Sequence, residues 1–170
     1  MYRVVHVFMG FSTGLLLCSL LNNSYWFLCG IMSGIGGYIP DLDLRIKHRK
    51  LLHNIIIPLV TITLIYSMTH LVFTNGSNVI LLIIDASLLS LLIGWLLHVF
   101  CDAFTKRGVY ILWPINEEVR VSLTPLKSGE LVGNLVVMII ASLEMYYWLR
   151  ISGYGNLLDK FMEEVLKLFS

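Results

Sequence analysis

Charged residues are scarce in this chain of 170 residues. Asp, Glu, Lys and Arg make up 14% of it, and the formal net charge is +1. We expect no nucleic-acid partner, because proteins that neutralise phosphates carry an excess of basic residues. Hydrophobic residues make up 57%, against about 45–50% in an ordinary globular domain, and the mean hydropathy is +0.80. The composition predicts an integral membrane protein.

Cysteine is also rare. Cys18 and Cys29 fall inside apolar runs, Cys101 lies near the end of another, and no CxxC spacing occurs. This pattern argues against both a disulfide framework and a thiolate zinc site. We expect all three to be small hydrophobic side chains inside a helix bundle.

Long apolar runs are the main feature of this sequence. A helix needs about 20 apolar residues to cross the hydrocarbon core of a membrane. The fold class predicted is all-α, a polytopic transmembrane helix bundle. The expected spans are residues 4–21, 25–39, 54–73, 79–100 and 131–149. We assign residues 1–150 to the transmembrane domain. Membrane lipids are the expected partners, and a homo-oligomer is left open.

The C-terminal tail, residues 151–170, has a different pattern. Between Asn156 and Phe169 the apolar side chains fall on one helical stripe and the charged side chains on the other face. Such an amphipathic helix lies along a membrane surface or packs on a partner.

Short turns and small residues indicate how the first two spans pack. Residues 22–24 read Asn-Asn-Ser, which is typical of a tight turn, so these spans form an antiparallel hairpin. Gly10 with Gly14 and Gly30 with Gly34 have the small-xxx-small spacing that lets helices approach closely. Close packing would hold the start of the first span near the loop after the second.

Basic residues are distributed unequally between the two sides of the predicted bundle. Nine of the twelve lie on the side that carries the N-terminus, the 40–53 loop and the 101–130 segment: Arg3, Arg45, Lys47, Arg49, Lys50, Lys106, Arg107, Arg120 and Lys127. The positive-inside rule makes this side cytoplasmic.

Histidines and carboxylates gather at the span ends on this same side, where burying them is costly. The candidate metal ligands are His6, Asp41, Asp43, His53, His98, Asp102 and Glu130. We assign His48 as a proton donor and Arg49 as an anion clamp. Imidazole and carboxylate without thiolate favour zinc, with manganese or iron as alternatives, and the ligands suffice for two divalent metal ions.

Two parts of this set have distinctive spacing. His98 and Asp102 are i and i+4, so one helix face presents both to a cation, although such a pair is often only hydrogen-bonded. Asp41 and Asp43 follow Pro40, which disfavours helix just before it, and in an extended segment both carboxylates point the same way. A solvated turn is the alternative there.

Other members have plainer alternatives. The basic residues around Arg49 would also bind anionic headgroups, and Glu130 would also complement a helix dipole. The polar segment 105–126 is either a lid over the site or an anchoring loop. Asp85 and Glu144 lie within spans, away from the cluster, where they either pair with Tyr or Ser or belong to an ion path.

The ordered motifs resemble the membrane-bound metal-dependent hydrolase family of the YdjM type over about residues 4–134. The resemblance rests on these elements: His6 with Gly10, Gly34-x-Gly36-Gly37 before Pro40-Asp41-Leu42-Asp43, His48-Arg49 with His53, and His98 to Asp102 followed by Thr105, Gly108 and Leu112-Trp113-Pro114. It implies an integral membrane helical protein and metal-dependent hydrolysis. Family members usually read His-Arg-x-x-Thr-His-Ser, whereas this chain has Leu52 and Asn54 beside His53.

The sequence thus predicts a membrane-embedded hydrolase. A metal-activated water would attack a phosphoester or other ester, expected to be that of a lipid, at the cytoplasmic leaflet. A metal-stabilised scaffold or assembly subunit without catalysis is the second hypothesis, and an ion transporter is the third.

Overall fold

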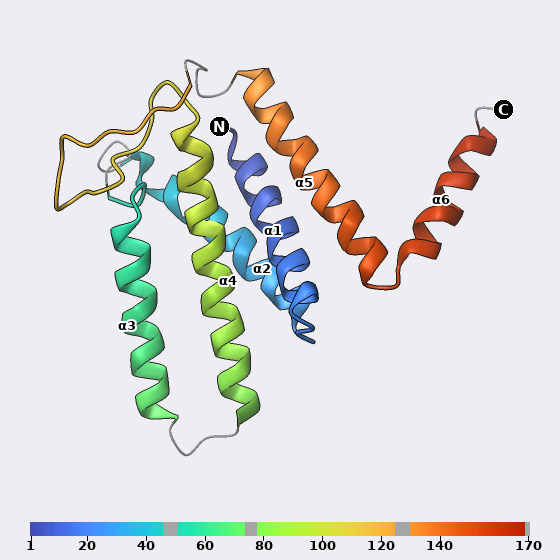
Figure 1. Cartoon of the computed structure of the whole chain (residues 1–170), viewed down its shortest axis with the longest axis horizontal. Coiled ribbons are helices and arrows are strands. Elements are labelled where there is room, and N and C mark those ends of the chain that lie inside the picture. Colours follow the sequence, from blue (N-terminus) through green and yellow to red (C-terminus); the bar gives the residue numbers. More distant parts are fainter. Residues whose placement is uncertain (46–50, 74–77, 125–129, 169–170) are drawn as a thin grey trace.

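The computed structural model describes residues 1–45, 51–73, 78–124 and 130–168. They form six α-helices and one 3₁₀-helix (Figure 1): α1 (Arg3–Leu20), α2 (Trp26–Tyr38), η1 (Ile39–Arg45), α3 (Ile56–Val72), α4 (Asn78–Ala103), α5 (Leu131–Ile151) and α6 (Gly155–Leu168). Within these ranges the only β pairing is a single bridge between Val109 and Val121. The predicted all-α fold is confirmed.

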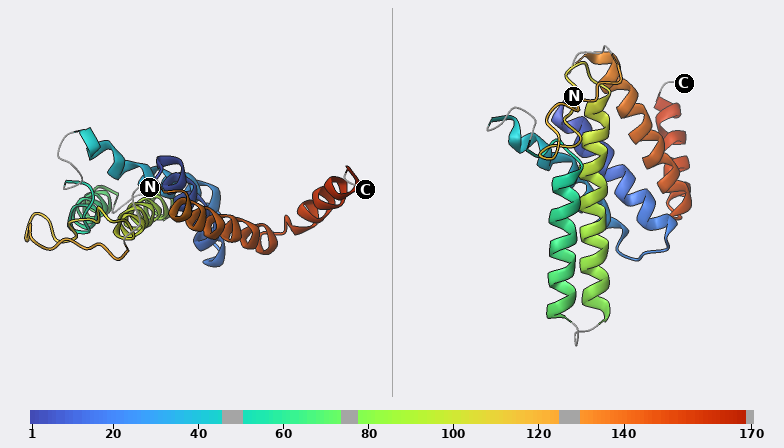
Figure 2. Two further views of the ribbon diagram at one scale, coloured as in Figure 1. Left: turned by 90° about the horizontal axis from the view of Figure 1, so that it is seen from above. Right: turned by 60° about the vertical axis from the view of Figure 1, so that its left-hand side comes forward.

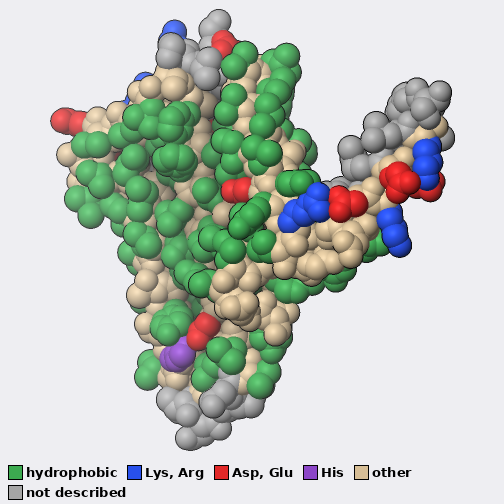
Figure 3. Space-filling view, turned by 45° about the vertical axis from the view of Figure 1, so that its right-hand side comes forward, with side chains coloured by type: hydrophobic (Ala, Val, Ile, Leu, Met, Phe, Trp, Pro, Cys, Tyr) green, Lys and Arg blue, Asp and Glu red, His purple; other side chains and the backbone are tan. Residues whose placement is uncertain are grey.

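Each predicted span corresponds to one of the helices. By length and composition, α1, α5 and the Val79–Ala103 part of α4 can cross a membrane, and α3 is a shorter apolar helix. Figure 3 shows hydrophobic side chains over much of one face of the bundle, while charged side chains gather on α6. The exposed apolar surface is what a lipid environment requires, because lipid chains solvate apolar groups.

Helices α1 and α2 form the predicted hairpin and pack extensively along their length. Asn22, in the turn between them, has a left-handed backbone with φ 52°. A Cβ on Gly14 would lie 2.5 Å from the carbonyl oxygen of Cys29, so no larger residue fits there. α2 also packs on α4, α3 lies beside α4, and α5 packs on α1 (Figures 1 and 2).

The hairpin also contains a disulfide, so the expectation for two of the cysteines was wrong. Cys18 and Cys29 are joined with an S–S distance of 2.03 Å, and Cys101 is free. The turn folds the end of α1 against the start of α2. It thereby brings together two thiols that are 11 residues apart and belong to no short motif.

Polar residues within the spans are paired between helices. Glu144 of α5 accepts hydrogen bonds from the hydroxyls of Ser12 (2.8 Å) and Thr13 (2.7 Å) of α1. Asp85 of α4 lies 3.0 Å from Nε2 of His70 on α3. Glu144 therefore has the kind of hydroxyl partner expected, whereas the partner of Asp85 is a histidine rather than Tyr or Ser.

Helix α6 leaves the bundle. It packs mainly on α5, and Arg150 joins the two helices through hydrogen bonds of 2.9 and 3.0 Å to the carboxylate of Asp159. Figure 2 shows α6 at the edge of the molecule, away from α3 and α4.

Candidate metal centre

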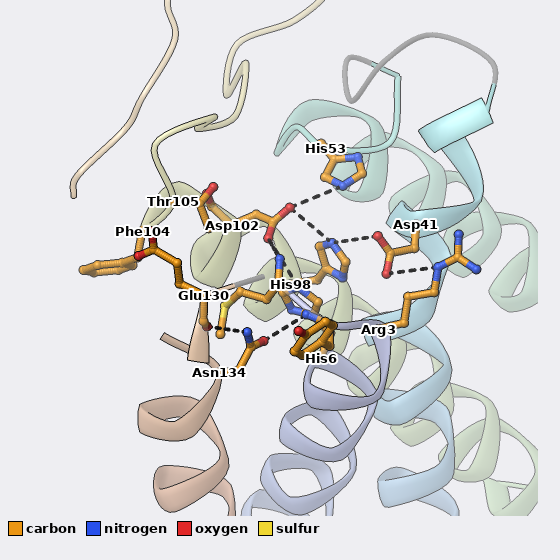
Figure 4. A network of polar contacts seen from close by, with 12 residues as sticks. Arg3, His6, Asp41, His53, His98, Asp102, Phe104, Thr105, Glu130 and Asn134 are labelled. Atoms are coloured by element: carbon orange, nitrogen blue, oxygen red, sulfur yellow. Dashed lines mark hydrogen bonds and ion pairs between the residues drawn. The ribbon is translucent and has the colours of Figure 1, made fainter. Parts of the chain in front are cut away.

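Five of the predicted ligands converge at the end of the bundle that carries the N-terminus (Figure 4). They come from four segments: His6 from α1, Asp41 from η1, His53 from the stretch before α3, and His98 with Asp102 from α4. All five are buried, with exposed fractions between 0% and 4%. Burial of so many ionisable groups needs compensation by pairing or by a metal.

Asp102 lies at the middle of the cluster. Its Oδ1 is 3.3 Å from Nε2 of His6, and its Oδ2 is 3.7 Å from Nε2 of His53 and 3.8 Å from Nε2 of His98. Asp41 approaches from the other side, with Oδ1 3.9 Å from Nε2 of His98. The rings of His6 and His98 are stacked with their centroids 3.7 Å apart.

One backbone contact orients His98. Its Nδ1 lies 2.7 Å from the carbonyl oxygen of Gly37, which can only accept, so Nδ1 carries the proton and donates it. In a neutral imidazole this leaves Nε2 as the acceptor, directed at the two carboxylates. A carbonyl partner of this kind fixes the tautomer of metal-binding histidines.

The ligand atoms form two overlapping groups. Those of His6, His98 and Asp102 lie within 4.8 Å of one another, and so do those of Asp41, His53 and His98. Both groups need His98, which has only Nε2 left for a cation. The described residues therefore form one centre rather than two separate ones.

The residues present fit a divalent cation of the predicted kind. Nδ1 of His6 and Nε2 of His98 are buried and have no hydrogen-bond partner among the described residues. Three imidazoles and two carboxylates form a donor set suited to zinc, manganese or iron.

Two helix contacts explain why the sequence folds this way here. His98 and Asp102 are one turn apart on α4, so they share a face, as their spacing predicted. A Cβ on Gly37 would lie 2.5 Å from the carbonyl oxygen of His6, so the glycine lets α2 pass close to α1. That close approach brings His6 and η1 to the same end of the bundle.

His53 is positioned by its neighbours. The indole Nε1 of Trp95 on α4 donates to the carbonyl of Leu52 (2.8 Å), which fixes this segment against α4. The side chain of Asn54 accepts from the backbone N–H of Ile57 (2.8 Å) at the start of α3. Asn54, which precedes the N-cap residue Ile55, thus provides an acceptor for a backbone N–H in the first turn of α3, as a serine hydroxyl there would also do.

The segment that carries Asp41 is not extended, so that expectation was wrong. Residues Ile39–Arg45 form the 3₁₀-helix η1, which continues directly from α2. Pro40 has no N–H to donate to the α-helical ladder, and the chain tightens into 3₁₀ turns instead of leaving the helix. The argument that Asp41 and Asp43 point the same way therefore does not apply.

Asp41 is electrostatically different from an ordinary surface carboxylate. Burial raises the pKa of its carboxyl, although nearby His6 and Arg3 act in the opposite direction. Nε of Arg3 lies 3.8 Å from Oδ2 of Asp41. A bound cation would favour the ionised carboxylate of Asp41, as the positive charge of Arg3 does.

The other predicted site residues are His48, Arg49, Asp43 and Glu130. His48, Arg49 and the side chain of Asp43 lie outside the described residues. Glu130 is the N-cap residue of α5, without a side-chain cap hydrogen bond, and it belongs to neither ligand group.

Sequence reasoning missed several residues that hold the centre together. The amino nitrogen of Met1 lies 3.1 Å from Oδ1 of Asp102. The backbone N–H of Tyr2 donates to Oδ1 of Asn134 (2.9 Å). Neither Asn134 nor Trp95 belongs to a motif. The only sequence feature that could have indicated them is a polar or indole side chain near the end of an apolar span.

The segment that follows α4 is anchored beside the centre. Val109 is fully buried and packs with Trp95 and Val99, while the N–H of Ile55 donates to the carbonyl of Ile111 (3.2 Å). Lys106 and Arg107 are exposed. This packing favours the anchoring role over a lid.

Comparison with known proteins identifies one family. The profile of the family described as "YdjM inner membrane protein" matches residues 1–158, nearly the whole chain. No curated protein and no solved structure matches.

Proposed function

Because this chain belongs to the YdjM inner membrane protein family, we propose that it is a membrane-embedded, metal-dependent hydrolase. Its substrate would be a phosphoester or another ester, carried by a lipid at the cytoplasmic face. The family match itself supports an integral membrane protein, and the hydrolytic function rests on the buried centre.

The observation that carries the proposal is the burial of three imidazoles and two carboxylates within contact of one another. The stability of the fold does not require such a cluster, because buried ion pairs are often no more stabilising than apolar side chains of similar volume. Perturbed, converging ionisable groups are typical of functional sites.

The residues have separable roles. His6, His53, His98, Asp41 and Asp102 would hold the cation, which when bound lowers the pKa of water and polarises an ester oxygen. Gly37 keeps Nε2 of His98 directed into the centre, and Arg3 compensates the charge of Asp41. His48 as proton donor and Arg49 as anion clamp remain predictions. A second ion would need ligands beyond the five described.

Two observations support the cytoplasmic orientation. Most basic residues lie on the side of the centre, as the positive-inside rule requires of the cytoplasmic side. The disulfide between Cys18 and Cys29 lies at the opposite end of α1, and disulfides persist in oxidising compartments. Cys101, at the end of α4 beside the centre, is free.

The test compares metal content and turnover. Wild type, Asp102→Asn and the control Asp85→Asn are purified in detergent, analysed for zinc, manganese and iron, and assayed on phospholipids and soluble phosphoesters. We expect metal and hydrolysis in wild type and Asp85→Asn. In Asp102→Asn we expect less metal and no hydrolysis, because its metal affinity should fall at least about tenfold, or about 1.4 kcal/mol. Metal-free wild-type protein would refute the proposal.

A metal-stabilised scaffold is the second candidate, because the ligands join α1, η1, α4 and the segment before α3. An ion there would tie these elements together. Structural metal sites have all positions filled by protein, while catalytic sites keep one open. Stoichiometric metal without turnover, and with no exchangeable water ligand by spectroscopy of a cobalt-substituted sample, would favour the scaffold.

A further inference from the structure

An apolar pocket of about 270 Å³ lies next to the metal centre, between α4 and α5. These two helices are not among the pairs that pack extensively together, and each packs on α1 instead. The walls include Leu97 and Phe100 of α4 and Val137 and Ile140 of α5, with Met9 of α1 between them. The pocket therefore lies among the spans, where the surrounding medium is lipid.

One end of the pocket is polar and adjoins the centre. Thr105, Glu130 and Asn134 line it, and Figure 4 shows all three near Asp102. Cys101, which also lines the pocket, directly precedes Asp102 in the sequence. An amphiphile in this pocket would place its polar end beside Met1, whose amino nitrogen lies 3.1 Å from Oδ1 of Asp102, and its apolar end between the helices.

The size of the pocket limits what fits. A helix of a partner protein would not fit the pocket. One turn of a helix about 10 Å wide occupies roughly 400 Å³, which is more than the volume of the pocket. A water-soluble ester would leave the apolar walls without a matching surface. Part of a single hydrocarbon chain, with its remainder in the surrounding lipid, suits both the volume and the lining.

We propose that this pocket holds an acyl chain of a membrane phospholipid, whose phosphoester headgroup then lies at the metal centre. The inference rests on the proposed hydrolase function, which already takes a lipid ester as substrate, and it adds the site of the acyl chain and its route, sideways from the bilayer between α4 and α5. Soluble phosphoesters would be poor substrates by comparison.

Photocrosslinking tests the pocket without requiring turnover. The full chain is placed in phosphatidylcholine vesicles that contain phosphatidylglycerol with a diazirine in one acyl chain, irradiated, and digested for mass spectrometry. We expect adducts concentrated on the pocket-lining parts of α4 and α5, with and without a chelator. Excess unlabelled phosphatidylglycerol should suppress them, whereas glycerol 3-phosphate should not.

Two tryptophan variants on one helix provide the matched comparison. Val137→Trp fills the pocket and should reduce the α4 adducts about tenfold, equivalent to about 1.4 kcal/mol of binding. Ile139→Trp, at a position that is 50% exposed and outside the pocket lining, should leave them unchanged. Thermal unfolding, measured on both variants, reports whether each retains the fold.

The possible failures are distinguishable. Adducts spread evenly over the lipid-facing helices, or unaffected by excess phosphatidylglycerol, would overturn the acyl-chain pocket even if the protein binds metal. Localised adducts on a wild-type protein that binds no metal would support the lipid pocket and overturn the hydrolase function alone.

Discussion

Substitution of Gly37 by alanine gives a sharp test of how the centre is assembled. Gly37 lies where α2 crosses α1, and its carbonyl oxygen accepts the hydrogen bond from Nδ1 of His98. A Cβ there would lie 2.5 Å from the carbonyl oxygen of His6. Ordinary contact begins at about 3.4 Å, so the two helices must separate by about 1 Å.

That separation would disturb two ligands at once, since His6 belongs to the helix that is pushed away and His98 depends on the carbonyl that moves. Overpacking of this kind typically costs about 1–3 kcal/mol of stability. Loss of an orienting partner lowers metal affinity by about 10–100-fold. We expect Gly37→Ala to weaken zinc binding by about 100-fold, or about 2.8 kcal/mol.

The assay is a zinc titration of metal-stripped protein in detergent against a competing chelator, with thermal unfolding measured in parallel. Gly34→Ala on the same helix is the control, because its Cβ would meet its nearest neighbour, Cβ of Phe11, at an ordinary 3.5 Å. It should bind zinc as wild type does and gain up to about 1 kcal/mol from helix propensity. Wild-type affinity in Gly37→Ala, or equal weakening in both variants, would refute the reasoning.

Three further outcomes are expected. Glu144→Leu leaves the hydroxyl of Thr13 without its acceptor, while Ser12 keeps the carbonyl of Met9, so it should cost about 1–3 kcal/mol in thermal unfolding with unchanged metal content; an unaltered melting curve would contradict this. Trp95→Phe removes the hydrogen bond that fixes the His53 segment and should weaken zinc binding about tenfold, which a chelator-competition titration measures. Thiol alkylation of the denatured protein without reductant should label one cysteine per wild-type chain, but two in Cys18→Ser, because Cys29 loses its partner; labelling of all three cysteines in wild type would count against the disulfide.

Helices α1, α4 and α5 could be predicted from the sequence because each is a long apolar run, and apolar runs of that length have one stable form in lipid. With 13 residues, α2 is too short for this argument. The pairing of His98 with Asp102 was predictable for a similarly local reason, since helix geometry places i and i+4 on one face. The alternation of spans then placed His6, Asp41 and His53 at the same end. All of these inferences need only local periodicity and the direction of each crossing.

The rest depends on contacts between distant segments. Nothing near Leu52 in the sequence indicates that Trp95 binds its carbonyl, and nothing near Gly37 indicates that its carbonyl orients His98. The 3₁₀ turns after α2 were missed because residues that precede a proline prefer an extended backbone. That preference was not strong enough here, and the chain before and after Pro40 stays helical. The disulfide was missed because the hairpin turn, rather than a short motif, determines which thiols meet.

The packing of α5 on α1 bears on how the protein is made. The first and last spans of the bundle are partners, joined by Glu144 to Ser12 and Thr13. Membrane chains are synthesised from the N-terminus, and all five residues of the centre precede α5. These five residues can therefore come together while the ribosome is still extending the chain, whereas the pocket beside them acquires its second wall only when the last span has entered the bilayer.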